Sequence, residues 1–526
     1  MKRTISILLR FAMLLGLLAG CGGNNSAGNG QQGGSSGGDD GAEKVLVFSR
    51  SATISGYDPI VNQTGMNRML NQLFYENLVT SDYSEDGSYE PELATSWETS
   101  EDGLTWTFHL REGVKYTDGN PFGSDDVAGV FNRIFNEEKC ATQKKNWAMV
   151  DSWECPDELT FVMHLNSTIS ELNMLTALEG LSIWRNERYE EYGEDMFNFD
   201  DTMKPVGTGT FIPDKWTVGS DSEFVRNKEW WGIGVLGEES NVDRLIYRPL
   251  TEEATRIAGI QTGELDWVDN VTVEYKERLE GSEGVIVEQL DSSLFVYMLF
   301  AADRGIFQDK NARLAANYAI DRELLATTIA GGGEGASWPC PSTCIGFDKD
   351  AACEPRDLKK AKAYLAETDY AGEELVLVAS NGLFARSKEI YQAVASMLTE
   401  AGFNINLQVL DNASVSTIRN NKEYDLHITN VICGNNPKAM LDCWIYDTHK
   451  GGYVNEEMFD LIQKGYAESD PSKAAEYLHD AMAMEEVAPV TGLYRGYALI
   501  AYRDGISNFD FCDSKNYFNF SHVQKD

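Results

Sequence analysis

The sequence predicts an α/β protein with at least two domains. The chain has 526 residues, and a single hydrophobic core stops growing beyond about 250–300 residues, so more than one domain is expected. In the carboxyl half, ELVLVAS (374–380) is a buried strand, 387–401 is an amphipathic helix ending at Gly402, and FNINLQVL (403–410) alternates as a strand does. Strand, helix and strand in this order are typical of a parallel sheet covered by helices.

Two further elements follow in the carboxyl half. YDLHITNVI (424–432) has the alternating pattern of another strand. Asp470-Pro471 then supplies a capping side chain and a first-turn proline, which predict a helix over SKAAEYLHDAMAMEE (472–486).

The amino half shows three local signals. Apolar residues between 65 and 78 form one helical stripe. LTWTFHL (104–110) alternates as a half-buried strand, and a turn at Glu112-Gly113 leads into a second strand ending within 117–121. Ser124 is expected to cap the next helix, whose first turn carries Asp125 and Asp126 at the positive end of the helix dipole.

The amino end predicts export and anchoring. A short basic start precedes an apolar run over 5–18, which is shorter than the about 20 residues that span a bilayer and suits a signal peptide. LAGC (18–21) resembles the lipobox of bacterial lipoproteins, which implies removal of 1–20 and acylation of Cys21. The Gly-, Ser- and Asn-rich stretch 22–42 then predicts a flexible tether. The alternative is a plain secretory signal with an incidental cysteine.

Composition excludes several classes of function. The chain has 83 Asp plus Glu against 44 Lys plus Arg, which argues against nucleic-acid binding because that rests on basic residues neutralising phosphates. The six histidines include no H-E-x-x-H motif. We therefore expect no nucleic-acid partner, no metal site and no cofactor.

The cysteines predict disulfides. Eight remain after Cys21, an even number that suits an oxidising compartment. Proximity in the sequence favours two pairs, Cys140 with Cys155 and Cys433 with Cys443. The pairing of the others stays open: Cys340, Cys344, Cys353 and Cys512. A metal site in CPSTCIGFDKDAAC (340–353) is the less favoured alternative, because its spacing lacks a paired C-x2-C.

Four ordered blocks resemble one known family. PELATSWETSEDGLTWTFHLREGVKYTDGNPFGSDDV (91–127) is similar to the signature of the family 5 bacterial extracellular solute-binding proteins, which are oligopeptide, dipeptide and nickel binders of ABC transporters. Three later stretches resemble further blocks of that family in the right order: PVGTGTF (205–211), RNKEWWG (226–232) and ARLAANYAIDRE (312–323). The resemblance spans roughly residues 45–510.

The resemblance implies a two-lobed, type II periplasmic-binding-protein-like α/β fold with a hinge and a small inserted domain. It places 44–82, 204–300 and 488–526 in lobe one, 83–203 in the inserted domain and 301–487 in lobe two. Residues 1–20 precede these as the signal peptide and 21–43 as the lipidated cysteine and tether. The signature block falls in the inserted domain and is therefore scaffold.

The implied function is that of a receptor, not an enzyme. Such a protein captures a small solute, most often a short peptide, between two closing lobes and delivers it to the permease of an ABC importer, with its ATPases. The resemblance implies a monomer outside the cytoplasm, on the cell surface or in the periplasm, held to the membrane by its lipid. An oligosaccharide or another non-peptide solute is the alternative ligand, and nickel chelates come third.

The resemblance also suggests ligand-binding residues. In peptide-binding relatives, a segment like W-x-A-D-x-x-x-P supplies an Asp that pairs with the α-ammonium of the peptide. Here NVICGNNPKAM (430–440) takes its place, with Asn430 at the Trp position and Cys433 at the Asp position. This departure puts ordinary peptide recognition in doubt. Either a nearby carboxylate, with Asp442 as the first choice, takes over the role, or the ligand has no free amino terminus. The other expected lining residues are Ala52, Thr53, Trp267, Asn270, Val431, Ile432 and Tyr494, with Phe384 and Trp444 as weaker candidates.

Two alternatives to these expectations stay open, one for the role of two aromatic residues and one for the function. Trp267 and Tyr494 would equally suit core packing. A surface hydrolase is the distant rival function, but GIGVLG (232–237) lacks a strand–turn–helix context and reads as a loop, and no nucleophile elbow or phosphate-binding loop is present.

Overall fold

A computed structural model gives the structure of the folded part of the chain. The residues that it describes are 43–51, 54, 56–62, 65–81, 89–198, 203–216, 219–236, 239–340, 344–351, 353–384, 386–432, 437–445, 451–452, 455–468, 470–484, 490–512 and 517–526. Residues 43–526 form one compact unit.

One large sheet runs through this unit. Its strands follow the order β15-β14-β16-β12-β17-β11-β1-β10-β9-β8, and β13 pairs with β17. The bounds of these strands are β1 Val45–Ser49, β8 Phe211–Trp216, β9 Ser222–Arg226, β10 Arg244–Tyr247, β11 Trp267–Val268, β12 Val285–Phe300, β13 Glu334–Gly335, β14 Glu374–Ser380, β15 Asn404–Leu410, β16 Leu426–Ile432 and β17 Val490–Arg503.

The remaining strands form smaller sheets. Four antiparallel strands in the order β4-β5-β7-β6 make the four-stranded sheet, and three two-stranded antiparallel sheets, β2-β3, β18-β21 and β19-β20, complete the set. Their bounds are β2 Val79–Ser81, β3 Tyr89–Pro91, β4 Ala94–Thr99, β5 Thr105–Leu110, β6 Val150–Asp157, β7 Thr160–Leu165, β18 Ile506–Ser507, β19 Asp510–Cys512, β20 Tyr517–Asn519 and β21 Gln524–Lys525.

The helices cover these sheets. Their bounds are α1 Gly65–Asn71, α2 Ser124–Asn136, α3 Ala141–Asn146, α4 Glu171–Leu178, α5 Asn186–Tyr192, α6 Glu253–Thr262, α7 Val273–Glu280, α8 Lys310–Ala319, α9 Leu358–Ala366, α10 Ser387–Ala401, α11 Asn412–Asn420, α12 Lys438–Ile445, α13 Glu456–Ala467 and α14 Pro471–Ala483. Among the described helices, none is both long and apolar enough to cross a membrane.

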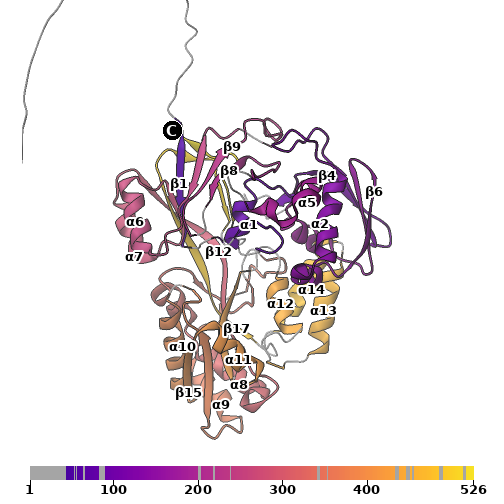
Figure 1. Cartoon of the computed structure of the whole chain (residues 1–526). Coiled ribbons are helices and arrows are strands. Elements are labelled where there is room, and N and C mark those ends of the chain that lie inside the picture. Colours follow the sequence, from indigo (N-terminus) through magenta and orange to yellow (C-terminus); the bar gives the residue numbers. More distant parts are fainter. Residues whose placement is uncertain are drawn as a thin grey trace, which may run out of the picture. The chain divides into compact units, whose positions relative to one another are not determined.

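Two long strands connect the two sides of the large sheet (Figure 1). The first half of β12 pairs only with β17, which in turn borders β11, the neighbour of β1; the second half of β12 also pairs with β16. The pairing of β12 with β17 shifts register between Asp291 and Phe295. We call β1 and β8–β11 the β1 side of the sheet and β14–β16 the β14 side.

The carboxyl-half predictions are confirmed. The strands predicted at 374–380, 403–410 and 424–432 are β14, β15 and β16, and β14 lies parallel to both of the others. The helix α10 ends at Gly402, whose φ of +116° suits glycine. The side chain of Asp470 accepts hydrogen bonds from the first turn of α14, as its capping position predicts.

Two amino-half predictions need correction. The helical stripe 65–78 is a helix only as far as Asn71, because the carbonyls of Leu73 and Phe74 accept hydrogen bonds from Phe211 and Gly209 instead. No strand follows β5 directly among the described residues: one isolated bridge joins Lys115 to Pro121 around a tight turn.

The start of α2 also differs from the prediction. Gly123 is the capping residue, because its backbone N–H bonds to the side chain of Asp126 at 3.0 Å. The hydroxyl of Ser124 donates instead to the carbonyl of Asp157, which ties α2 to the four-stranded sheet.

The predicted disulfide between Cys140 and Cys155 is wrong, since both thiols are free. Cys140 lies in the turn after α2, close to Arg133, whereas Cys155 lies on β6 beside Ser124 at the start of α2. The length of α2, about 1.5 Å per residue, separates the two sites far beyond the roughly 7 Å between Cα atoms that a disulfide allows. Cys433 and the side chain of Cys443 lie outside the described residues, so that pair stays a prediction.

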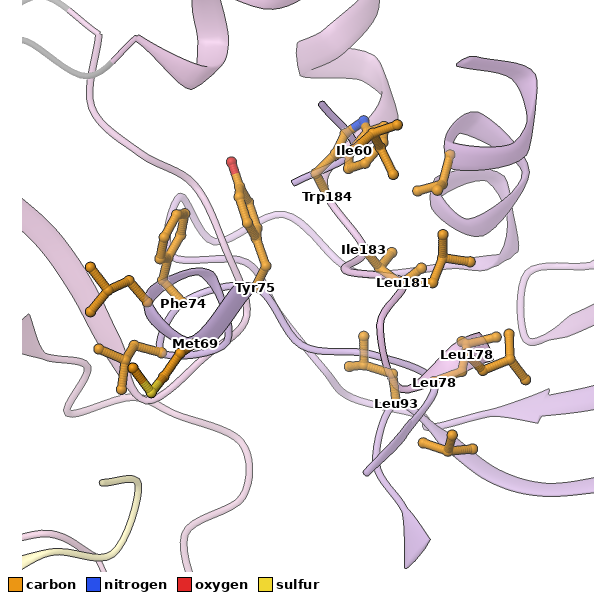
Figure 2. Close-up of a cluster of buried hydrophobic side chains, with 14 of the residues drawn as sticks. Ile60, Met69, Phe74, Tyr75, Leu78, Leu93, Leu178, Leu181, Ile183 and Trp184 are labelled. Atoms are coloured by element: carbon orange, nitrogen blue, oxygen red, sulfur yellow. The ribbon is translucent and has the colours of Figure 1, made fainter. Parts of the chain in front are cut away.

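The hydrophobic core joins the four-stranded sheet to the β1 side. Figure 2 shows part of this core, where Leu78 lies beside Leu93 and Leu178, and Phe74 lies beside Met69. On the other side, one cluster packs β12, β14 and β16 against α8 and α10, and another lies under α12–α14. A smaller cluster lies beneath α6 and α7.

Candidate functional site

The first edge of the candidate site is built by three parallel strands. β1 lies parallel to β10 on one side and to β11 on the other. The carboxyl ends of parallel strands meet at one edge of a sheet, where α/β proteins bind ligands. The residues that follow β1 and β11, Arg50 and Asp269, therefore lie at the same edge.

A buried ion pair holds this edge together. The guanidinium of Arg50 contacts the carboxylate of Asp269, and both side chains are almost fully buried. Burial raises the pKa of Asp269, and Arg50 and Arg256 oppose that rise. Arg256 of α6 also donates to the backbone carbonyl of Asn270 at 3.4 Å. Removing one partner of such a buried pair costs about 3–5 kcal/mol. We therefore assign the ion pair a structural role, which is to hold the ends of β1 and β11 together.

Asn270 is the exposed residue of this edge. Its φ of +49° is unusual for residues other than glycine, although Asn tolerates it better than most. The buried Asp269 and the anchored backbone thus present the Asn270 side chain outward, next to the start of α7.

The second edge lies on the β14 side. β14 and β16 are parallel, so Ser380 and Ile432 end their strands at a common edge. The segment after β14 carries Phe384 and Arg386. The hydroxyl of Tyr391 donates to the carbonyl of Ser380 at 3.0 Å, which fixes α10 against the end of β14.

One row of residues crosses the sheet at this edge. Asn430 of β16 is opposite Val296 of β12, Val296 is opposite Tyr494 of β17, and Tyr494 is opposite Gly335 of β13. Directly paired residues project to the same face of a sheet, so Asn430 and Tyr494 share a face. The family resemblance suggests both residues as lining residues, and the structure places them in one row.

Tyr494 lies among aromatic rings. Its ring centroid is 6.2 Å from that of Phe384, and the Phe384 centroid is 5.6 Å from that of Tyr391. Tyr494 is buried, and burial raises the pKa of its hydroxyl. This placement agrees with core packing as well as with a wall of the site.

The two edges are in contact. Glu274, four residues after Asn270, forms an ion pair with Arg386, two residues after Phe384. Arg386 also donates to the carbonyl of Ile329 at 3.1 Å. Nearby, a Cβ on Gly331 would lie 2.3 Å from the side chain of Val273, so the backbones approach closely there. These contacts place Val273 and Glu274 against 329–331 and Arg386.

Asp442 is already paired in this structure. Its carboxylate accepts hydrogen bonds from the Lys438 ammonium at 2.6 Å and from the Tyr466 hydroxyl at 3.2 Å. The Lys438 ammonium also lies 4.6 Å from the centroid of the Tyr466 ring. Asp442 therefore belongs to a small polar cluster on α12 and α13.

This polar cluster contacts the start of α4. The carbonyl of Tyr466 accepts hydrogen bonds from the backbone of Ser170 at 3.0 Å and from the side-chain amide of Asn173 at 3.3 Å. We call these two hydrogen bonds the α4–α13 contact. It connects α4 with the β14 side of the molecule.

The candidate site thus has two edges, each at the carboxyl ends of parallel strands: β1, β10 and β11 form one, and β14 and β16 form the other. Both edges carry residues that the family resemblance suggests. A model of "Bacterial extracellular solute-binding proteins, family 5 Middle" matches residues 88–452 of the chain. The chain belongs to the family 5 bacterial extracellular solute-binding proteins. Glutathione-binding protein GsiB of Pectobacterium atrosepticum is 25% identical over 371 residues, which are 70% of this chain and 70% of that protein.

Solved structures share the fold. DppA from Helicobacter pylori, in complex with the peptide STSA, superposes with a TM-score of 0.74 at 23% identity and covers 91% of this chain and 98% of that one. HbpA2 from Haemophilus parasuis gives 0.81 at 20% identity, covering 92% and 100%. The two-lobed, type II periplasmic-binding-protein fold is thus confirmed, and this family 5 protein is an extracytoplasmic solute-binding protein of an ABC importer.

The other predicted ligand-binding residues of this family 5 protein fall into three groups. Trp267 is fully buried, with ring centroids of Phe520 and Phe509 at 5.9 and 6.5 Å, which supports the core-packing alternative. Val431 is partly buried against the cluster beneath α12–α14. Ala52, Thr53, Cys433 and the side chains of Ile432 and Trp444 lie outside the described residues.

Sequence reasoning missed the charged residues of the two edges. Arg50 and Asp269 stand directly after β1 and β11, and Glu274 and Arg386 stand near the starts of α7 and α10. Arg50 and Asp269 could have been found from their positions at the carboxyl ends of strands. The two ion pairs could not have been predicted, because each joins residues more than a hundred positions apart.

Proposed function

We propose that this protein captures a short peptide between the two edges and delivers it to the permease of its importer. The observation that supports the proposal is the ion pair of Glu274 with Arg386, which joins the edge that carries Asn270 to the edge that carries Asn430 and Tyr494. A ligand that touches both edges stabilises their closed arrangement, since only differential contacts shift such an equilibrium. The likeness to DppA in complex with a peptide supports this ligand class.

The α-ammonium of a peptide needs an acidic partner in this site. An unpaired buried charge costs several kcal/mol, and Cys433 stands where peptide-binding relatives have an Asp. We propose Asp442 as the substitute. Its present partner Lys438 is partly exposed and can turn to water when an ammonium takes its place.

A second candidate ligand is a solute without a free amino terminus, such as an oligosaccharide. One observation favours it: Asp269 and Asp442 are each already engaged by a basic residue, Arg50 and Lys438 respectively. Such a neutral ligand would be held by hydrogen bonds from Asn270 and Asn430 and by aromatic faces such as Phe384.

Calorimetry distinguishes these ligands. A short-peptide pool, the same peptides with acetylated amino termini and an oligosaccharide panel are titrated into the protein, and the recovered ligands are checked for intactness. If Asp442 is the partner, acetylation and Asp442→Asn each weaken peptide binding by roughly tenfold or more. The matched control is Asp460→Asn, which removes the carboxylate of another i,i+4 pair on α13.

Each other outcome contradicts part of the proposal. Full binding of free peptides by Asp442→Asn would exclude that residue as partner. Binding of saccharides or blocked peptides alone would replace the peptide by the second ligand class. Chemical conversion of a bound ligand would contradict the receptor role in favour of a hydrolase.

We further propose that the protein is a monomer anchored through acylated Cys21. The basic start, the apolar run 5–18 and LAGC (18–21) support this. Intact mass of the protein from its native membrane should show loss of residues 1–20 and addition of diacylglycerol. Cys21→Ala should abolish the lipid and leave the folded unit unchanged, whereas an unlipidated amino terminus elsewhere would refute the anchor.

A further inference from the structure

An exposed apolar loop follows the Trp230-Trp231 pair. Ile233 is 38% exposed and Val235 is 58% exposed. The other large exposed hydrophobic side chains among the described residues stand singly along the chain: Val61, Tyr192, Ile286 and Leu324. We call Ile233, Gly234 and Val235 the apolar tip. Clustered exposed apolar residues mark interaction surfaces more than single ones do.

The conformation of the apolar tip is fixed at its base. The indole N–H groups of Trp230 and Trp231 donate to the two carboxylate oxygens of Glu76 at 2.7 and 2.6 Å. Gly232 packs beneath the Trp230 ring, where a Cβ would approach to 2.3 Å, and its carbonyl accepts hydrogen bonds from Val235 and Leu236 at 2.9 Å. The backbone of the tip is thus held in place while its side chains face water.

The apolar tip shortly precedes, in the sequence, a segment that is bonded to the start of the folded unit. The segment 239–244 follows the tip closely in sequence, and the backbones of Asp243 and Arg244 donate to the carbonyl of Lys44 at 2.8 and 3.2 Å. Arg226 fastens this segment through Glu239 and Asp243. The chain from Cys21 to Ala42 joins the unit here, and even fully extended it reaches at most about 75 Å. An anchor at Cys21 would therefore hold this end of the molecule within about 75 Å of the bilayer, so that it can reach the membrane surface.

We propose that the apolar tip inserts into the interface of the bilayer and docks the anchored protein on the membrane. Aliphatic and tryptophan side chains are the residues that enter bilayer interfaces. Two aliphatic side chains alone bind weakly, but the anchor turns their insertion into an intramolecular step at high effective concentration. The chain is strongly acidic, so the matching surface is zwitterionic rather than anionic.

The test separates this proposal from the anchor on which it rests. The chain from residue 22 onward is attached to phosphatidylcholine vesicles through an amino-terminal histidine tag and a nickel-chelating lipid, so that acylation is not needed. Amide hydrogen exchange of 230–236 is then compared with that of the same protein free in solution. We expect exchange to slow by roughly tenfold on attachment.

Two variants complete the test. Ile233→Ser with Val235→Ser should lose the protection, whereas Val61→Ser, which changes an exposed aliphatic residue elsewhere, should keep it. Equal exchange in the attached and the free wild-type protein would overturn the proposal. Protection that appears only when the vesicles contain the permease would overturn it too, by assigning the tip to a protein partner. An unlipidated Cys21 in the native protein would refute the anchor without changing these exchange results.

Discussion

At the scale of single residues, Glu76 is the most consequential buried group. It accepts hydrogen bonds from two indoles, and its backbone carbonyl accepts one from Ile183, so it joins the β1 side to the elements around the four-stranded sheet. Burial raises the pKa of Glu76 to about 7, against an ordinary value of 4.5, and the hydrogen bonds from Trp231 and Trp230 oppose that rise. Burial and the nearby Glu76 raise the pKa of Glu92 as well. Arg111 is the cation nearest to this pair, 4.7 Å from the centroid of the Trp231 ring.

This arrangement predicts a loss of stability as pH rises. The folded state holds a proton on Glu76 that the unfolded state releases above pH 4.5, so its contribution is full below pH 4.5 and is lost as pH rises through about 7. The upper limit of the effect on the free energy of unfolding is on the order of 3 kcal/mol. Denaturant unfolding between pH 4.5 and 8, followed by tryptophan fluorescence, measures it.

The matched variants make that prediction specific. Glu76→Gln should reduce the pH dependence and leave the part that Glu92 contributes. It should also lower stability at pH 5 by about 1 kcal/mol, because an amide cannot accept from both indoles. The control is Glu90→Gln, an exposed glutamate on the nearby β3, which should leave the profile unchanged. An unaltered slope in Glu76→Gln would mean that Glu76 does not titrate in this range.

At the scale of elements, the sequence predicted helices and strands well where local sequence determines the structure. The strands β14, β15 and β16 and the helix α10 follow from alternation, apolar runs and Gly402. Prediction failed where a distant segment decides: the stripe after Asn71 is drawn out of helix by hydrogen bonds to Gly209 and Phe211. Cys140 and Cys155 are near in sequence but lie at opposite ends of α2, which no spacing rule reveals.

The α4–α13 contact carries a prediction at this scale. It joins α4 to the α12–α13 cluster that contains Asp442, so we expect it to stabilise the closed arrangement of the two sides. Asn173→Ala removes one of its two hydrogen bonds, worth about 0.5–1.5 kcal/mol, and should weaken ligand binding about threefold in calorimetry. The control is Asn166→Ala, which removes an amide-to-carbonyl bond to Ala148 and leaves α13 untouched. Equal affinities of Asn173→Ala and wild type would show that the contact does not depend on closure.

At the scale of the whole molecule, the sequence indicated the family, the two-lobed fold and the receptor role, because four ordered blocks retain the family pattern. It indicated the candidate site less well. Asn430 and Tyr494 do share a row, but Trp267 is in the core, and the pairing of Glu274 with Arg386 depends on how two distant edges pack. The lobe boundaries expected near residues 300 and 488 remain a proposal. The strands β12 and β17 each extend along both sides of the sheet.

The central claim is that one ligand touches both edges at once. The most direct test is amide hydrogen exchange with and without the tightest-binding peptide from the pool. The account predicts simultaneous protection of 269–274 on the β1 side and of 380–386 and 430–432 on the β14 side. Protection of one edge alone would contradict it. So would protection confined to the separate hollow of about 340 Å³ that Glu288, Leu290, Tyr502 and Phe509 help to line.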